Sequence, residues 1–582
     1  MRNIRTYEDI EAARAAGELT SAEEKLIACC QEGWLCKLGD GTLPTAPSGA
    51  RTIRADLLRY LITGGGEGCV VHDLGVQLSG AYVPGLLDLD YAQAKGATDL
   101  DHCHFEQKIY ARYCHLNTLS LQGSALQQGL SAQGAVIVGN VFLRNGFSAK
   151  GSIVLNGTKI GGQLTCTGGK IEVTDGDALN AQRAQITGGV FLCDKFSAKG
   201  GVTLASAKIT GQLACDQGTF QAEDNIALDL QDTRAAYFFW KGVTGISGEL
   251  DLSNAHFDTL TDDPKSWGKV AELSLVGLTY AHITNPGDTA KRLAWLGKGH
   301  EMNGEFSPQP YTQLAKVLRE MGHDRDARTV LVAGEIRHRR SEWEEIEKRR
   351  AERWALRNDV KRNDTRNLES NRETIFDSHF QKDFERSLRI CIDAAEDHPN
   401  RPSDAQLELA RLGLRQDLQW FNAKDKLRIW WLKAKSYGLN KLVGYGYKPF
   451  NSLWALVVLV LLAAGLSHMA WQRGDFAPNS DVILSTAEWQ NLAEDKTVRN
   501  PAFQWSDKHG KGRDYETFNP LAYGFDVVVP IVNIGQEAAW APSTTRGPWG
   551  WTLWWMRWFF TVFGWIVTAL GAAAIAGVIR RE

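Results

Sequence analysis

Residues 141–171 read VFLRNGFSAKGSIVLNGTKIGGQLTCTGGKI, and residues 190–220 read VFLCDKFSAKGGVTLASAKITGQLACDQGTF. Aligned at an offset of 49 positions, the two stretches are identical at 16 of 31 positions. An internal repeat of this quality is typical of stacked structures, in which each repeat buries its apolar face against the next.

Short alternating strands lie inside this long period. Equivalent apolar residues recur after 12, 11, 15 and 11 positions, at Val141, Ile153, Leu164, Leu179 and Val190. Such strands, broken by glycine, suit a β-sandwich or a solenoid. A sandwich needs hairpin turn pairs, whereas here one glycine or small polar residue recurs at equivalent corners. The sequence therefore predicts a parallel β-solenoid, or β-helix, over residues 70–283.

Identical side chains stack in ladders in a parallel solenoid. The repeat aligns Phe142 with Phe191 and Cys166 with Cys215. We therefore expect Phe142 and Phe191 to be buried ladder positions.

Two motifs in or just before this region can also be interpreted as binding sites, one for zinc and one for phosphate. Residues 98–116 contain a set of zinc-compatible side chains, namely His102, Cys103, His104, Cys114 and His115. Cys103 and Cys114 are one strand repeat apart, which favours ladder neighbours over a metal site, and no tight Cys-x-x-Cys turn is present. The glycine-rich residues 62–68 lack the Lys-Ser/Thr ending of a phosphate loop and are interpreted as the turn into the first coil. We expect no metal and no other cofactor.

Helical segments flank the predicted solenoid. Residues 1–69 have helical patterning and can cover the open strand edge as a cap. Residues 284–448 form a predicted helical connector, in which residues 341–367 mix both charge signs as a solvated helix does. Because the formal net charge is only −3, we expect no nucleic-acid partner.

Two long apolar segments follow the connector. We predict a membrane-spanning helix in residues 449–472, an extracytoplasmic loop over residues 473–550, and a second spanning helix with a short tail in residues 551–582. Seven Lys/Arg against one acid precede the first span, while the loop has seven Lys/Arg against ten Asp/Glu. Basic residues favour the cytoplasmic side, so both termini are predicted to be cytoplasmic, in a bacterial inner membrane. The ten cysteines all lie before residue 392 and show no disulfide framework.

A half-length apolar helix is predicted over residues 519–530, within the loop. Asn519 can cap it, Pro520 suits its first position, and Pro530 cannot continue it. It can enter the bilayer and return as a re-entrant segment, or lie flat on the outer surface. If it enters and lines a pore, the groups that matter are Asp526, Pro530, Asn533, Gly535, Gln536 and Glu537.

Small residues share one face of the second span, at Ala569, Ala573 and Gly577. Such residues let membrane helices approach closely. The face can pack against the first span of the same chain or against another subunit, which would make a homo-oligomer.

Five stretches are RADLLRYLI (54–62), GVQLSGAYVPGLLDLDYA (75–92), PYTQLAKVLREMGHDRDA (310–327), VGYGYKP (443–449) and NPLAYGFDVVVPIVNIGQEAAWAP (519–542). Together they resemble a bacterial family of two-span membrane proteins with a cytosolic β-solenoid, often labelled membrane-associated oxidoreductases. The resemblance implies this architecture, and the label implies an oxidoreductase. The sequence has no Rossmann glycine pattern, Cys-x-x-Cys pair or haem attachment motif to support that activity.

Three functions are compatible with these features. The first is a membrane-anchored sensor or effector, whose solenoid binds a cytosolic protein or small-molecule ligand and whose two spans assemble in the lipid bilayer, in one form as a channel-like gated pore. The second is the oxidoreductase of the family label. The third is a non-catalytic membrane scaffold. The sequence favours the first, because it contains a long binding surface and no catalytic motif.

Overall fold

The computed structural model describes residues 3–302, 304–362, 390, 404–529 and 531–577. It contains two compact units, Met1–Gly334 and Glu335–Glu582. Pro530, the predicted end of the half-helix, lies outside the described residues.

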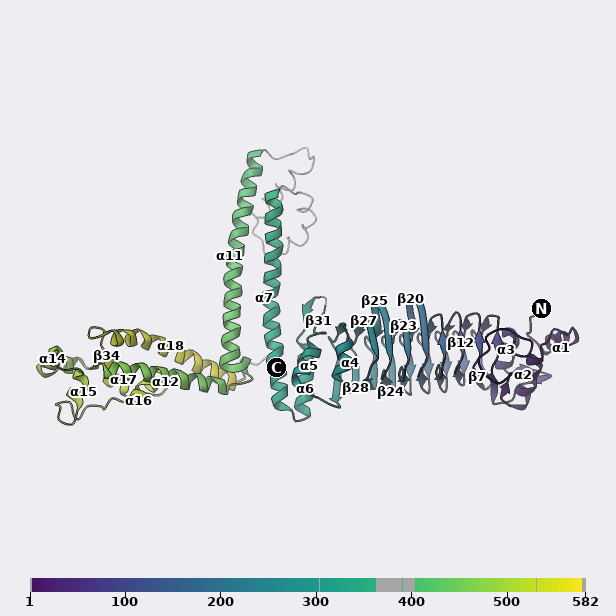
Figure 1. Ribbon diagram of the computed structural model, residues 1–582, viewed down its shortest axis with the longest axis horizontal. Coiled ribbons are helices and arrows are strands. Elements are labelled where there is room, and N and C mark those ends of the chain that lie inside the picture. Colours follow the sequence, from purple (N-terminus) through teal and green to yellow (C-terminus); the bar gives the residue numbers. More distant parts are fainter. Residues whose placement is uncertain (1–2, 303, 363–389, 391–403, 530, 578–582) are drawn as a thin grey trace. The chain divides into compact units, whose positions relative to one another are not determined.

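The first unit is built around a parallel β-solenoid of about nine turns, which confirms the predicted fold (Figure 1). Its strands form two long sheets, A and B. Sheet A contains β1 (Cys36–Lys37), β4 (Gly75–Ser79), β7 (Ala97–Asp101), β10 (His115–Leu116), β11 (Leu119–Ser120), β14 (Val136–Ile137), β15 (Val141–Phe142), β18 (Lys159–Ile160), β19 (Leu164–Thr165), β21 (Gln185–Ile186), β22 (Val190–Phe191), β24 (Lys208–Ala214), β26 (Arg234–Trp240), β28 (His256–Asp262) and β30 (Thr279–Ile283). Sheet B contains β5 (Tyr82–Val83), β6 (Leu87–Asp88), β8 (His104–Phe105), β9 (Ile109–Tyr110), β12 (Ala125–Leu126), β13 (Leu130–Ser131), β16 (Ser148–Ala149), β17 (Ile153–Val154), β20 (Lys170–Asn180), β23 (Ser197–Thr203), β25 (Thr219–Asp229), β27 (Gly245–Asp251) and β29 (Glu272–Ser274).

The register explains the 49-residue repeat. Val141 pairs with Leu164, and Leu164 pairs with Val190, all in sheet A. Ile153 pairs with Leu179 in sheet B. The 49-residue repeat therefore spans two turns of the solenoid. Each turn adds one residue to the ladder in sheet A and one residue to the ladder in sheet B.

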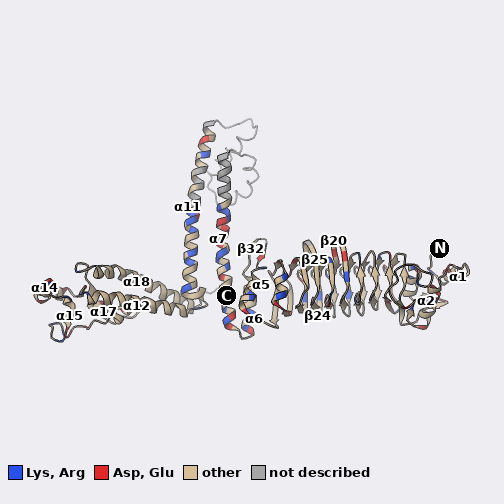
Figure 2. Ribbon diagram, in the orientation of Figure 1, with Lys and Arg blue, Asp and Glu red and all other residues tan. Residues whose placement is uncertain are grey.

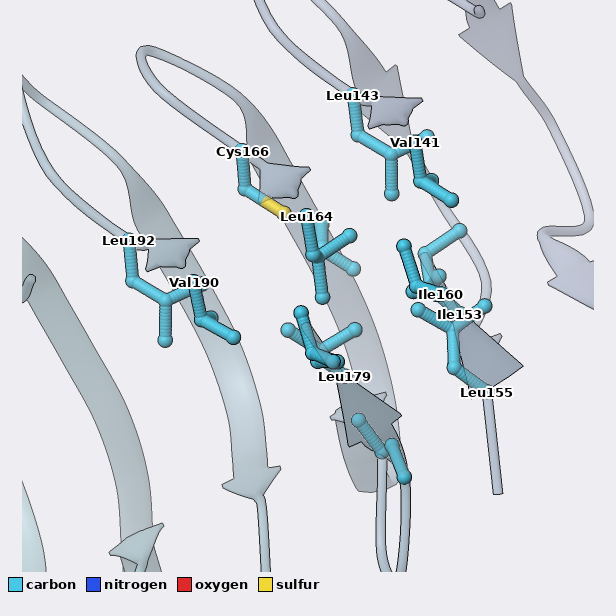
Figure 3. Close-up of a cluster of buried hydrophobic side chains, with 14 of the residues drawn as sticks. Val141, Leu143, Ile153, Leu155, Ile160, Leu164, Cys166, Leu179, Val190 and Leu192 are labelled. Atoms are coloured by element: carbon cyan, nitrogen blue, oxygen red, sulfur yellow. The ribbon is translucent and has the colours of Figure 1, made fainter. Parts of the chain in front are cut away.

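The interior of the solenoid is a stack of aliphatic ladders. Figure 3 shows side chains such as Val141, Leu143, Leu164, Val190 and Leu192 meeting inside the coil, and all five are fully buried. Burying such a side chain contributes about 1.5–3 kcal/mol. The repetition of apolar residues at these positions therefore stabilises every turn against its neighbours.

The prediction that Phe142 and Phe191 are buried is wrong. Both are only half-buried, because the residues on either side of each, at positions 141 and 143 and at 190 and 192, take the inward positions of the strand. The Arg144 guanidinium lies over the Phe142 ring at 4.3 Å, on the outer surface.

The interpretation of Cys103 and Cys114 as ladder neighbours is also wrong. Thr98 pairs with Leu119 one turn later, so eleven residues are about half a turn. The next turn brings Ser124 beside Cys103, whose amide donates to the Ser124 hydroxyl at 2.8 Å. His104 instead stacks on Tyr82 at 4.7 Å. Within the described residues, no three His, Cys, Asp or Glu side chains form a group that could hold a metal ion.

Three helices cover the first turn of the solenoid, α1 (Tyr7–Ala15), α2 (Ser21–Glu32) and α3 (Ala55–Ile62). β1, in the same region, pairs with β4, so sheet A begins before residue 70. The glycine-rich stretch forms a short hairpin of β2 (Gly65–Gly66) and β3 (Cys69–Val70).

Three more helices follow at the other end, α4 (Pro264–Lys269), α5 (Thr289–Leu296) and α6 (Gln309–Glu320). The side chain of Gln309 donates to the Leu278 carbonyl and that of Gln313 donates to the Tyr280 carbonyl, so α6 covers the edge of the last turn. A hairpin of β31 (Glu301–Met302) and β32 (Glu305–Phe306) precedes α6, and α7 (Asp324–Arg362) follows it.

The second unit contains two helices that are long and apolar enough to cross a membrane, α12 (Phe450–Gln472) and α18 (Pro548–Ile575). Only 22% of the most apolar stretch of α12 and 28% of that of α18 are buried. α11 (Asp404–Val443) and a short turn, η1 (Gly444–Gly446), precede α12. Between α12 and α18 lie β33 (Phe476–Pro478), α13 (Asp481–Leu484), α14 (Ala487–Glu494), α15 (Pro501–Ser506), α16 (Pro520–Val528), α17 (Gln536–Ala539) and β34 (Trp540–Pro542).

Candidate functional site

The half-helix predicted between the apolar segments is α16. The Asn519 side chain caps it by accepting from the amides of Leu521 and Ala522. Pro520 occupies its first position, where a missing amide hydrogen costs nothing. The helix ends at Val528, after nine residues.

α16 contacts both α12 and α18, which also contact each other, and two glycines allow the close approach (Figure 1 shows the three helices). A Cβ on Gly524 would lie 2.7 Å from the backbone of Ala464 and of Val460 in α12. On the other side, a Cβ on Gly564 of α18 would clash with the Val528 carbonyl oxygen. The half-helix is therefore wedged against both apolar helices, and reaches the middle of α18.

The chain enters and leaves this wedge on one side. The Ser467 hydroxyl, near the C-terminal end of α12, lies 3.5 Å from the Pro520 carbonyl oxygen, so α16 starts at that end of α12. After the turn, the Gln536 side chain accepts from the Asn519 amide at 2.9 Å and donates to the Thr517 carbonyl at 2.9 Å. Residues 519–529 thus run toward the middle of the two apolar helices and residues 531–537 return from it, and we call these two stretches the re-entrant segment.

Asp526 stabilises the part of the re-entrant segment in which the chain turns back, by accepting hydrogen bonds from its backbone amides. Its carboxylate is 9% exposed, and one oxygen accepts from the Ile534 amide at 2.8 Å while the other accepts from the Glu537 amide at 2.8 Å. The first bond holds the turn before α17, and the second satisfies an amide in the first turn of α17 that has no partner within the helix. The sequence singles out Asp526 as a polar group in an apolar helix, and the structure gives it a backbone-binding role.

The other predicted site residues surround the same turn. The side-chain oxygen Oδ1 of Asn533 accepts from the Gly535 amide, and Gly535 has a left-handed φ of 94° that suits glycine. Gln536 is buried at the base of the return, and Glu537 pairs with Arg557 of α18 at 3.8 Å.

The turn of the re-entrant segment presents apolar side chains outward. Ile531, Val532 and Ile534 are 77%, 44% and 48% exposed. Exposed apolar groups of this size are typical of a surface covered by lipid or by another chain.

The face predicted for helix packing lies outside the buried row of α18. Ala569 is exposed and Ala573 and Gly577 are half-buried. α18 instead buries a different row, namely Phe560, Gly564, Val567, Gly571 and Ala574. Small residues therefore occur on two faces of α18, and the glycines of the buried row make close contacts, Gly564 with Val528 of α16 and Gly571 with Ser452 of α12. Contact of the Ala569, Ala573 and Gly577 face with the first span or with another subunit stays a prediction.

A cavity of about 180 Å³ lies at the end of the solenoid in the first unit, and the sequence analysis missed it. Its walls come from α4, α5 and the segment before α5, and include Pro264, Trp267, Pro286, Ala294 and Trp295. The ring centroids of Trp267 and Trp295 are 5.2 Å apart. No motif marks these residues, because the cavity forms only when residues some 30 positions apart in sequence meet.

The cavity is lined by three basic and two acidic side chains. Arg292 is neutralised by Asp262, with distances of 2.5 and 2.8 Å between the guanidinium and the carboxylate. Lys298 donates to the carbonyls of Val270 at 2.7 Å and Trp267 at 3.1 Å. The second acid, Asp288, accepts from the Ala290 amide in the first turn of α5. Lys291 is exposed at the wall. Apolar walls with a few convergent polar groups are typical of small-molecule sites.

The cavity is connected to α7 through one hydrogen bond. The Thr289 hydroxyl, in the first turn of α5, donates to the Asp326 carboxylate in the first turn of α7 at 2.8 Å. The helix that supplies Lys291, Arg292 and Trp295 is therefore tied to the start of the helix that leaves the unit.

Comparisons with protein-family models, curated proteins and solved structures found no match to this chain.

Proposed function

We propose that the protein is a membrane-anchored sensor or effector. Its solenoid binds a small ligand in the cavity between α4 and α5, and its second unit sits in a bacterial inner membrane with both termini in the cytoplasm. The observation that carries the membrane part is the re-entrant segment, wedged by Gly524 and Gly564 between two helices that leave most of their apolar surface exposed.

The cavity favours a ligand with a flat apolar part and an anionic group. Trp267 and Trp295 line the cavity with their few exposed aromatic atoms, being 4% and 3% exposed, and Pro264 and Pro286 add apolar wall beside them. Lys291 and Lys298 supply positive charge beside it. The volume of about 180 Å³ equals roughly six water molecules of liquid, which suits a single-ring molecule.

Ligand binding is tested by titrating the purified full-length protein with benzoate and phenyl phosphate and following tryptophan fluorescence. We expect a saturable change that Ala294→Trp, which fills the cavity, and Lys291→Glu, which reverses its free charge, both weaken by at least tenfold. Lys208→Glu, an exposed lysine on the solenoid wall, is the matched charge control and leaves binding unchanged. Binding that is equal in all three variants would refute the cavity as the site.

The second part of the proposal is that several copies of the chain assemble in the membrane. The most specific version of this part is that they form a channel-like pore. Both carboxylate oxygens of Asp526 are occupied by backbone amides, whereas Asn533 is exposed at the turn. In such a pore Asn533, rather than Asp526, faces the axis. Reconstituted protein is then expected to conduct ions, with a conductance that Asn533→Ala changes. A monomer in mild detergent, with no conductance in vesicles, would exclude this part.

A further inference from the structure

α11 has an exposed basic and aromatic face beside the start of α12. Residues 424–448 contain seven Lys/Arg and one acid (Figure 2). Among their apolar side chains, Leu427 is 69% exposed, Trp430 65%, Trp431 54% and Tyr437 67%. A helix with aromatic and aliphatic groups next to lysines has the composition of a helix that lies on a membrane surface.

The buried positions of α11 show which side this face occupies. Ile429, Ser436 and Val443 are buried and recur every seven residues, on one side of the helix. At 3.6 residues per turn, Leu427 and Trp431 lie on the opposite side. Lys424, Lys435 and Lys441 flank them, and the Lys435 ammonium lies 5.0 Å from the Trp431 ring.

A contact of α11 with α7 lies away from Leu427 and Trp431. It is made by Lys433, whose ammonium lies 3.1 Å from Glu347 and 5.6 Å from the Trp343 ring. Lys433 lies closer to the buried side of α11 than to the side of Leu427 and Trp431.

The turn between α11 and α12 fixes the direction of α11. Gly444, Tyr445 and Gly446 all have left-handed φ values, of 53°, 54° and 91°. The Tyr445 hydroxyl lies 2.6 Å from the Ser436 hydroxyl, and the Asn451 side chain donates to the Lys441 carbonyl. As a result α11 leaves the start of α12 at a steep angle (Figure 1). When α12 crosses a bilayer, α11 runs along its surface.

We infer that this face of α11 binds the anionic headgroups of the cytoplasmic leaflet. The inference rests on the proposed membrane location of α12. Charge complementarity supports an anionic lipid surface as the occupant, because each Lys or Arg close to such a surface adds attraction that salt screens. The indole and phenol rings suit the depth of the headgroups, where an apolar body and a polar tip are both accommodated. α11 thereby holds the connector against the membrane.

Hydrogen exchange on the full-length protein in lipid nanodiscs tests the inference. One disc contains phosphatidylcholine alone, and the other contains phosphatidylcholine with one third phosphatidylglycerol. We expect the amides of residues 424–442 to exchange at least about fivefold more slowly in the anionic disc, with the difference lost in 0.5 M NaCl. The double variant Lys435→Glu/Lys441→Glu should lose the difference. The control Lys159→Glu/Lys208→Glu, with the same change of charge on the solenoid, should keep it.

Two outcomes separate this inference from the proposed function. If α12 and α18 are protected in both discs but α11 exchanges equally in both, the inference is overturned while the membrane location stands. If α12 and α18 exchange freely because the protein does not enter the disc, the proposed function itself fails.

Discussion

Three buried carboxylates, those of Asp526, Asp475 and Glu23, accept hydrogen bonds from backbone amides. Asp526 accepts from two amides at the return of the re-entrant segment. Asp475 accepts from the Gly550 amide in the first turn of α18, and Glu23 accepts from the amides of Thr20 and Arg54 in the cap. A carboxylate that accepts from amides is stabilised in its charged form, so its burial needs no catalytic explanation.

Asp526→Ala is expected to lower the thermal stability of the second unit. The change leaves the Ile534 and Glu537 amides without their acceptor, at a cost of about 1–3 kcal/mol for each buried group left unpaired. Asp514→Ala, a highly exposed acid in the same loop, is the control. Equal melting temperatures for the two variants, measured in one detergent, would show that Asp526 does not hold the turn.

Asp229 on the outer surface of sheet B predicts a pH effect. Burial raises the pKa of its carboxyl, hydrogen bonds from the Gln231 amide and the Thr203 hydroxyl oppose the rise, and the charges of Asp251 and Asp177 add to it. The folded pKa is above the unfolded value of about 3.9, so the protonated form of Asp229 stabilises the folded state. This contribution to the free energy of unfolding is complete below about pH 3.9 and is lost as the pH rises through the folded pKa.

Asp229→Asn is therefore expected to raise the melting temperature at pH 7.5 and to have a smaller effect at pH 4.5. Circular dichroism of the β signal measures the difference, and Asp258→Asn, at a largely exposed acid, controls for the lost charge. A stabilisation that does not shrink on acidification would contradict the assignment.

The ladder register is tested by a pair of substitutions. Leu164 is fully buried and Phe191 half-buried, so Leu164→Ala is expected to lower the free energy of unfolding by about 2–5 kcal/mol. Phe191→Ala should cost less, although it removes more atoms. Denaturant unfolding followed by circular dichroism compares the two variants. A larger loss of unfolding free energy for Phe191→Ala would show that Phe191, and not the ladder of Leu164, takes the inward position.

At the scale of elements, the sequence predicts the strands that repeat along the solenoid and the helices that begin with a capping residue. The solenoid could be predicted because each ladder needs similar side chains in successive turns. The equivalence of Val141, Leu164 and Val190 was predicted correctly. The inward position of Phe142 was predicted wrongly, because Val141, Phe142 and Leu143 are all apolar and a two-residue strand gives no alternation to choose between them. α16 could be predicted from Asn519 and Pro520, which cap and start it.

The packing of α16 could not be predicted in the same way. Glycines and alanines occur on two faces of α18, and only the shape of the neighbouring helix selects Gly564 over Ala569. The cavity beside Trp267 and Trp295 was missed because its walls are far apart in the sequence.

Gly524→Leu is expected to displace α16 from α12, since the new side chain meets the backbone of Val460 and Ala464. Hydrogen exchange of residues 520–528 should then rise by at least about tenfold, because helices without packing are marginal. The matched control is Gly465→Leu in α12, where an added Cβ meets open space. Similar exchange in both variants would mean that α16 is not held by this contact.

At the scale of the whole molecule, the proposal is that the chain crosses a membrane twice and that the re-entrant segment enters from the outer side. Basic residues precede α12, and acids outnumber them in the loop between α12 and α18. The nine free cysteines among the described residues are all buried, and all ten cysteines of the chain precede residue 392. New cysteines in the second unit can therefore be labelled over a low background.

The most direct test is labelling of single cysteines with a membrane-impermeant maleimide, at Lys508 in the loop, Ile531 in the re-entrant turn and the exposed Arg340 in α7. We predict that the cysteine at 508 reacts in intact spheroplasts, that the cysteine at 340 reacts only after permeabilisation, and that the cysteine at 531 reacts only after detergent removes the bilayer. Labelling of 340 and 508 from the same side would contradict the two crossings, and labelling of 531 as readily as 508 would place the re-entrant segment outside the membrane.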